Sequence, residues 1–166
     1  MITEALHGKN RILLWRLLED EKKQDGALMM FQSEHSVEKS ADSDSTVTKT
    51  GTIRKKGVME EEISFNSIVA KGDPTIALLD KAIAEGKVVE LWEVDVSEEP
   101  NAGKYPAIYR QGYITDLSYT ANAEDDMEVE GTFATNMMAQ AGEATLTLAQ
   151  IEAAQYKYRD VTKVAQ

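Results

Sequence analysis

The stretch Tyr119–Phe133, YTANAEDDMEVEGTF, contains the pattern that decides the fold. From residue 126 onward polar and apolar residues alternate, with Asp126, Glu128, Glu130 and Thr132 set against Met127, Val129 and Phe133. Successive side chains of a strand point to opposite faces. The pattern therefore predicts a strand that buries one face and carries a row of carboxylates on the other. Residues 113–132 contain six acidic and no basic residues.

The same alternation occurs in Val58–Ala70, VMEEEISFNSIVA. One predicted face holds Ile63, Phe65, Ser67 and Val69, and the other holds Glu60, Glu62, Ser64 and Asn66. Two further segments, Arg11–Leu18 and Ala27–Val37, are also predicted as strands. Periodicity alone leaves the first of these open between a short helix and a buried strand, and the β-rich sequence that follows favours the strand.

One helix is well specified, at about residues 74–85, in GDPTIALLDKAIAEGK. Asp73 can cap its first turn, Pro74 suits the first helical position, and Gly86 stands where a helix ends. Its predicted apolar stripe consists of Ile76, Leu79, Ala82 and Ile83.

The remaining segments extend the β pattern. Lys87–Val96 is predicted as a strand buried on much of both faces, and Ala107–Thr120 and Met127–Thr135 as a strand–turn–strand unit. Thr147 and Gln150 form a capping pair for a short helix, and the final YKYRDVTKV can supply a last strand. We therefore expect a mainly β fold in a single domain, residues 1–166, arranged as a β-sandwich or distorted barrel flanked by the helix at 74–85.

A polar segment, residues 36–57, is too long for an ordinary connection and has no core of its own. Its Thr and Val content predicts an extended arm or hairpin. It holds five basic residues against three acidic ones, in a chain whose net charge is −11. A positive arm on a negative body can dock on a copy of itself; its cations are Lys39, Lys49, Arg54, Lys55 and Lys56.

The composition excludes several classes of function. A net charge of −11 and a pI near 4.7 argue against a surface that holds nucleic acid through its phosphates. The absence of cysteine excludes disulfides and thiolate chemistry. The start of the sequence lacks the pattern of a secretory signal, and its apolar runs are too short to cross a membrane.

No set of residues forms a catalytic or metal-binding motif. The two histidines, His7 and His35, have no partner at ligand spacing. Adjacent carboxylates such as Glu60 and Glu61 would point to opposite faces of a strand, so a solvated face explains them better than a glycosidase or Ca²⁺ site. The sequence predicts no enzyme and no cofactor.

Three longer segments resemble a known family: GYITDLSYTANAEDDMEVEGTF, VAKGDPTIALLDKAIAEGKVVELWEVDV and GKYPAIYRQGYIT. The early FQSEHS and the late LTLAQIEAAQY agree with it. The chain resembles, over nearly its whole length and in order, the major tail proteins, or tail-tube proteins, of long non-contractile-tailed phages of Gram-positive bacteria.

This resemblance implies a structural virion protein of the phage tail, assembled in the cytoplasm of the bacterial host. It implies rings, typically hexameric, whose sheets join edge to edge and which stack into a tube for DNA. Tape-measure, tail-terminator and distal-tail proteins are the further partners that it implies. DNA would pass through without specific binding, and no membrane is involved.

Two hypotheses follow for this chain. The first is that Glu60, Glu62, Asp126, Glu128 and Glu130 line the lumen of the tube, where they repel DNA phosphates. The second is that the arm at 36–57 is mobile in the monomer and becomes ordered against the next ring.

Two alternatives remain open. The first is a tube protein of a contractile tail or secretion system, which shares the fold. The second is a carbohydrate-binding β-sandwich module, whose aromatic platform could come only from Tyr105, Tyr109, Tyr113 and Tyr119.

Overall fold

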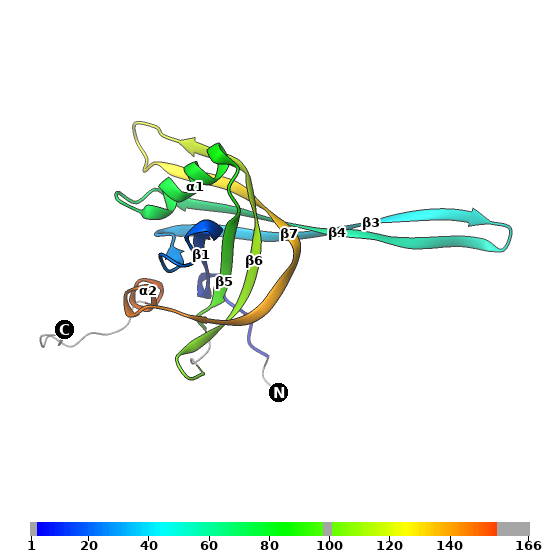
Figure 1. Ribbon diagram of the computed structural model, residues 1–166, viewed down its shortest axis with the longest axis horizontal. Coiled ribbons are helices and arrows are strands. Elements are labelled where there is room, and N and C mark those ends of the chain that lie inside the picture. The colour runs from blue at the N-terminus through cyan, green and yellow to red at the C-terminus, as the bar shows by residue number, and fades with distance from the viewer. Residues whose placement is uncertain (1–2, 98–100, 156–166) are drawn as a thin grey trace, which may run out of the picture.

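Within the described residues, seven strands form one antiparallel sheet in the order β2-β1-β5-β6-β7-β4-β3 (Figure 1). The computed structural model describes residues 3–97 and 101–155, so the strand predicted near the C-terminus lies outside the described residues. The strands are β1 (Arg11–Leu17), β2 (Ala27–Leu28), β3 (Gln32–Thr48), β4 (Gly51–Ile68), β5 (Val89–Asp95), β6 (Lys104–Thr120) and β7 (Glu128–Thr145). The helices are α1 (Pro74–Glu85) and α2 (Leu148–Ala154), and short 3₁₀ turns occur at Gly8–Asn10 and Leu18–Asp20.

The sheet curls until its two ends meet through a side chain. The Gln32 amide, at the start of β3, donates from Nε2 to the Leu13 carbonyl at 2.7 Å and accepts from the Leu13 N–H at 2.8 Å. It thereby satisfies backbone groups of β1 that a neighbouring strand would otherwise pair. The mainly β fold with one flanking helix is confirmed. The strands form a single open, curled sheet, not the two packed sheets of a sandwich.

The main core lies on the inner face of this sheet. Trp15 of β1 makes edge-on contacts with Phe65 of β4 and Phe133 of β7, with ring centroids 5.0 and 6.0 Å apart. Leu79 and Ala82 of α1 pack into the same cluster, which explains their helical spacing. The helix is capped as predicted, because the Asp73 side chain accepts from the Thr75 N–H and Gly86 adopts φ 62°.

A second core lies on the outer face of β1, β5 and the first half of β6, where α2 covers it. Ile12, Leu14, Val94, Tyr105 and Leu146 are buried there, with Ile151 and Ala154 of α2 against them. Strand β5 is thus buried on both faces, as its apolar sequence predicted. The capping box of α2, formed by Thr147 and Gln150, is also present.

Several strand bounds differ from the sequence prediction. The predicted strand Ala27–Val37 is broken at residues 29–31, where Phe31 has φ 52° and the chain turns between β2 and β3. Strand β7 begins at Glu128 and continues to Thr145, well past the predicted end at Thr135. Its later half is less alternating because it is exposed on both faces, and periodicity is a weak signal there.

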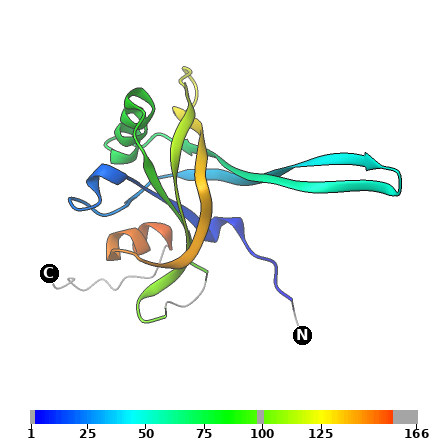
Figure 2. The same ribbon diagram turned by 45° about the vertical axis from the view of Figure 1, so that its right-hand side comes forward.

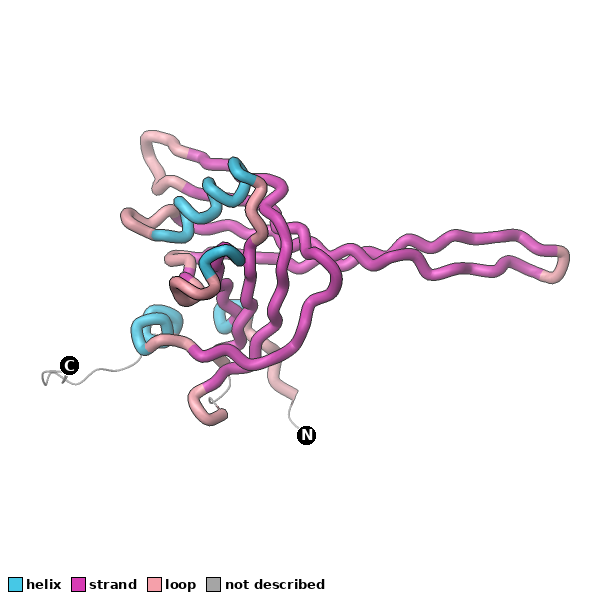
Figure 3. Tube along the Cα trace, viewed as in Figure 1, coloured by secondary structure: helices cyan, strands magenta, loops and turns pink. Residues whose placement is uncertain are grey.

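The segment 36–57 is the outer part of a hairpin formed by β3 and β4. Figures 1 and 2 show both strands leaving the sheet and projecting far from the body, and Figure 3 shows them as uninterrupted strands. The turn lies between the paired residues Thr48 and Gly51. A bulge interrupts the ladder near Gly57, where a side-chain Cβ would collide with the backbone of Asp42. The prediction of an extended arm or hairpin is confirmed.

Candidate assembly surfaces

The outer face of β3, β4 and β7 has no helix over it and carries carboxylates. On β4, the exposed Glu62 alternates with the buried Glu61 and Ile63. On β7, Glu128 and Glu130 are exposed while Val129 between them is fully buried. The strand alternation that the sequence predicted is confirmed for both strands. We use the name acidic face for the outward carboxylates of these strands and β6: Glu34, Glu38, Glu60, Glu62, Asp116, Glu128 and Glu130.

The register places some of these acids directly beside one another. Glu38 of β3 is the cross-strand partner of Glu62, and Asn66 separates Glu34 from Glu130 in the same row. Like charges directly opposite in a sheet destabilise it. The acidic face therefore works against the stability of the isolated chain, which suggests that assembly or function maintains it.

Asp126 is the one predicted member of this row that the structure places elsewhere. Because β7 begins at Glu128, Asp126 lies in the preceding turn and does not share the strand alternation. Sequence analysis also missed Glu34, Glu38 and Asp116. Their alternation is clear only once the strand register shows which neighbours they face.

The projecting part of the hairpin carries four of the five predicted arm cations. Lys49 lies in its turn, and Arg54, Lys55 and Lys56 lie on β4. All four side chains are exposed, and none forms an ion pair among the residues that the structure describes. Exposed apolar residues accompany them, since Val47 is 81% and Ile53 56% exposed.

Lys39, the fifth predicted cation, belongs to the base of the hairpin. Its Nζ atom lies 3.5 Å from Oε2 of Glu61, which is buried and paired with the buried Arg110. Sequence analysis did not identify this pair. The sequence does hold a signal for this pair. Strand alternation places Glu61 on the same buried face as Ile63 and Phe65, and a carboxylate buried there needs a cation as its partner.

A second group of charges extends this base toward β1 and β5. His35 Nε2 lies 3.1 Å from Glu93 Oε2, and Arg11 Nη1 lies 3.2 Å from Glu93 Oε1. The hydrogen bond with His35 holds the pKa of Glu93 below its ordinary value, against the opposing effect of burial, and the charges of Arg110 and Arg11 act in the same direction. These contacts tie β3 to β5 across the inside of the curled sheet, so the hairpin leaves a fixed base.

Three strand edges are the longest of those that have no partner strand within residues 3–97 and 101–155. They are the outer edge of β3, the edge of β4 from residue 51 to 61, and the edge of β7 from residue 135 to 145. Free edges present unpaired N–H and C=O groups that template pairing with another chain. Such length of unprotected edge is unusual for a chain that works alone.

The four tyrosines do not form an exposed platform for a sugar. Tyr105 is buried in the second core, Tyr109 donates to Glu90 and lies against Trp92, and Tyr119 donates to Asp80. Tyr113 is the most exposed of them, at 40%. This arrangement gives no support to the carbohydrate-binding alternative.

The described part of the chain lacks two other kinds of feature. It holds no group of three or more His, Cys, Asp or Glu side chains placed to bind a metal ion. Neither described helix is long and apolar enough to cross a membrane.

Known proteins similar to this chain are components of tails. A protein of Staphylococcus phage phiMR25, described as a tail protein, is 28% identical over 163 residues, which cover 95% of this chain and 83% of that protein. The SPP1 tail tube has a similar fold, with a TM-score of 0.77 at 18% identity over 98% of this chain and 91% of that one. The tail of a gene transfer agent particle, solved with C6 symmetry, gives 0.64 at 15% identity, covering 82% and 98% of the two chains.

The fold is also shared beyond phage tails. The tube-terminating cap of the anti-feeding prophage gives a TM-score of 0.55 at 13% identity, over 88% of this chain and 95% of that one. The fold by itself therefore does not separate these classes of tube. The family model for phage tail tube proteins matches residues 5–153, which is most of the sequence. This chain belongs to the phage tail tube protein family.

Proposed function

We propose that copies of this chain close into rings through their free strand edges and that the rings stack into the tube of a phage tail, around the path of DNA. The observation that carries the proposal is the pairing of long free edges with a projecting, charged hairpin in a member of the tail tube family. Neither feature stabilises the isolated chain. Both become useful when copies assemble.

Ring closure would remove the exposed edges. The sheet ends at β3 on one side and at β2 and β1 on the other, and from residue 135 onward β7 has no partner strand on its β4 side within the described residues. Pairing these edges between copies in a closed ring leaves none free, as in any barrel. Six copies per ring is the number we propose, in line with the family resemblance and the C6 symmetry of one structural neighbour.

The acidic face is the surface that we assign to the lumen. Glu60, Glu62, Glu128 and Glu130 project from the part of the outer face that neither described helix covers. Carboxylates lining a narrow water-filled channel would repel the phosphates of DNA, so that the DNA moves without binding. The cross-strand repulsion between Glu38 and Glu62 is then a cost of function.

The hairpin is the element that we assign to contacts between rings. Its cations Lys49, Arg54, Lys55 and Lys56 form no ion pair with the described residues of their own chain, while the body is strongly acidic. Oppositely charged surfaces steer association and fix register. The hairpin of one copy would dock on the body of the next copy. This contact is head-to-tail, so it can repeat without limit.

The place of the protein follows from this proposal. It would be a structural component of the virion tail, assembled in the host cytoplasm, with no catalytic role. Its further partners would be the proteins at the two ends of the tube and the tape-measure protein inside it.

Negative-stain electron microscopy of the concentrated protein tests the proposal. We expect hollow tubes or stacked rings from the parent chain. The double variant Arg54→Glu with Lys56→Glu should form few or no tubes, because both substitutions reverse charge on the hairpin.

The matched control is Lys22→Glu with Lys104→Glu, which makes the same charge change at two exposed lysines of the body that form no ion pair in the described residues. This control should still assemble. A parent chain that stays monomeric at every concentration and ionic strength would contradict the proposal.

A further inference from the structure

An exposed apolar patch lies at the end of the body opposite the hairpin tip. It consists of Met30, Phe31, Ile68, Val69 and Met127, and we call it the end patch. Backbone hydrogen bonds hold its three segments together, from Ile68 N–H to Phe31 carbonyl at 3.2 Å and from Val69 N–H to Met127 carbonyl at 2.8 Å. Phe31 is 63% exposed, Met127 41% and Met30 37%.

The turn that presents Phe31 is fixed from three sides. Asp73 Oδ2 accepts from the Met30 N–H at 2.9 Å, while its other oxygen caps α1. Ser67 Oγ donates to the Met30 carbonyl at 2.7 Å, and Gln32 Nε2 donates to the Met29 carbonyl at 2.9 Å. The exposed ring therefore stands on a rigid support, as an anchor of a binding surface does.

Phe31 is also in a backbone conformation that does not suit it. Its φ of 52° lies in the left-handed region, where glycine and asparagine are favoured and a bulky residue is strained. A turn selected only for stability would carry one of those residues. The aromatic side chain is 63% exposed and gains little compensating burial from the described residues, which is consistent with a contact to another copy.

Acidic residues border the end patch. The turn before β7 contains Glu124, Asp125 and Asp126, and Glu128 follows Met127 directly. The Asn122 side chain accepts from the N–H groups of Glu124 and Asp125 at 3.0 and 2.8 Å, which holds this turn in place. Apolar centre and acidic border together form one surface.

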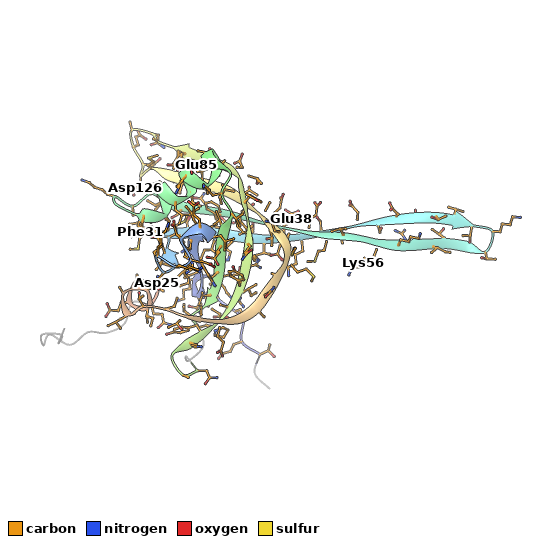
Figure 4. The ribbon with its side chains drawn as sticks, viewed as in Figure 1. Asp25, Phe31, Glu38, Lys56, Glu85 and Asp126 are labelled. Atoms are coloured by element: carbon orange, nitrogen blue, oxygen red, sulfur yellow. The ribbon has the colours of Figure 1, made fainter. Side chains whose placement is uncertain are left out.

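The hairpin tip has the complementary composition. Val47 and Ile53 are its exposed apolar side chains, and Arg54, Lys55 and Lys56 are basic. Figure 4 shows Phe31 and Asp126 at one end of the longest axis of the molecule, with Lys56 on the hairpin that leaves the other end. A tip and a surface at opposite ends cannot meet within one chain, but they can meet between successive copies.

We propose that the end patch is the receptor for the hairpin tip of a copy in the adjacent ring. Val47 shares one face of the hairpin with Arg54 and Lys56, whereas Ile53 and Lys55 point to the other face. Val47 would cover Phe31 and Met127, and Arg54 and Lys56 would face the acidic border. The inference rests on the proposed function, since it requires stacked rings. Beyond the proposed function, the inference names the surface of the next copy that the hairpin contacts and the side chains that make the contact.

Cysteine crosslinking tests this contact directly, because the natural chain contains no cysteine. A single chain carrying both Val47→Cys and Met127→Cys would be assembled into tubes and oxidised. We expect a ladder of covalent oligomers on a denaturing, non-reducing gel, since each copy would link to the next. The same chain kept dilute and monomeric should give no ladder.

The matched control places the second cysteine at Leu148→Cys, on α2, where an apolar side chain is 66% exposed. Val47→Cys with Leu148→Cys should form tubes without a ladder. Tubes that crosslink through Leu148, or through neither position, would overturn the receptor assignment and leave the proposed function standing. Failure of the cysteine-free parent to form tubes would overturn the proposed function itself.

Phe31→Asn provides a second, independent measurement. Asparagine tolerates the left-handed region, so the thermal unfolding midpoint of the monomer should stay the same or rise. Tube formation should require at least several-fold more protein, because the anchor of the end patch is lost. Unchanged tube formation by this stable variant would contradict the inference.

Discussion

Gly112 of β6 shows how closely the sheet is packed where it bends. A Cβ at this position would lie 2.9 Å from the ring of Phe133 and would collide with the carbonyl oxygen of Ala134. Gly131 on β7 is similar, since a Cβ there would lie 2.7 Å from both the Asp116 carbonyl oxygen and the Phe65 ring. The aromatic core reaches the backbone of two strands because these positions have no side chain.

We therefore expect Gly112→Ala to destabilise the monomer by about 1–3 kcal/mol through overpacking. The free energy of unfolding, measured in urea, checks this value. Gly142→Ala is the control, because a Cβ there meets nothing within 4 Å. That variant should stay within about 0.5 kcal/mol of the parent chain. Equal effects of the two substitutions would refute the packing argument.

The Glu19 carboxylate is expected to make the stability of the chain depend on pH. Lys81 and Lys87 donate hydrogen bonds to Glu19 at 2.8 and 2.9 Å, and they lower the pKa of Glu19 from 4.5 to about 2. A carboxyl whose pKa is depressed in the folded chain stabilises the fold above its unfolded pKa. This contribution should be lost as the pH falls from about 4.5 toward 2, and the lowered pKa of Glu93 acts with the same sign.

Glu19→Gln should reduce the loss of stability between pH 7 and pH 3, measured as the shift in urea midpoint. The control is Glu4→Gln, at an exposed glutamate without an ion pair in the described residues. The control should keep the full pH dependence of the parent chain. If both variants lose the same stability between pH 7 and pH 3, the Glu19 contacts do not contribute to the pH dependence of folding.

At the scale of elements, α1 and the β2–β3 turn are linked through one carboxylate. Asp73 accepts from the Thr75 N–H at 2.8 Å and from the Thr75 hydroxyl at 2.6 Å, and it also binds the Met30 N–H. The Asp-Pro pair thus starts the helix and fixes the turn that holds Phe31. By contrast, Thr147 caps α2 at an exposed position, and its side chain forms no hydrogen bond outside the capping box among the described residues.

Asp73→Ala should cost about 2 kcal/mol or more, because it removes a helix cap and leaves a part-buried N–H unsatisfied. Thr147→Ala should cost about 1 kcal/mol or less, as expected for an exposed cap. Urea unfolding of the two monomeric variants measures both values. A smaller effect at Asp73 than at Thr147 would show that the turn does not depend on this carboxylate.

At the scale of the whole molecule, charge separates the chain into a basic hairpin and an acidic face. The chain has a net charge of −11, yet the projecting hairpin carries cations that form no ion pair among the described residues. The half of the sheet that α2 covers is apolar outside, whereas the uncovered half is acidic. One curled sheet therefore presents a basic hairpin, to which we assign contacts between copies, and an acidic face, which we propose repels DNA.

Charge reversal on the acidic face should make the tubes bind DNA. Tubes of the variant Glu62→Lys with Glu130→Lys should bind a fluorescent DNA duplex with steep salt dependence, while parent tubes should not. Binding would be measured by co-sedimentation with the tubes. The control reverses Glu4 and Glu85, two exposed acids outside this face. Equal DNA binding by both variants would place the acidic face away from the lumen.

The sequence predicted local features well where one physical signal dominated. Asp73, Pro74 and Gly86 set the bounds of α1, since capping and left-handed backbone depend on neighbours in sequence. The alternation around Ile63 and Val129 identified the buried face of two strands correctly. Strand bounds failed at Phe31 and after Thr135, where the hydrogen-bond partners of the strand are distant in sequence.

The sequence by itself determined the helix, the alternating strands, the basic arm and the acidic rows, because each depends on residue types at short spacing. Only the tertiary structure decided that Lys39 pairs with Glu61, that Glu38 faces Glu62, and that Asp126 lies outside the strand. These facts follow from register and curvature, which are set by contacts between residues far apart in the chain. The row of carboxylates in Tyr119–Phe133 was visible in the sequence, but the face of the sheet that it shares with β3, β4 and β6 was not.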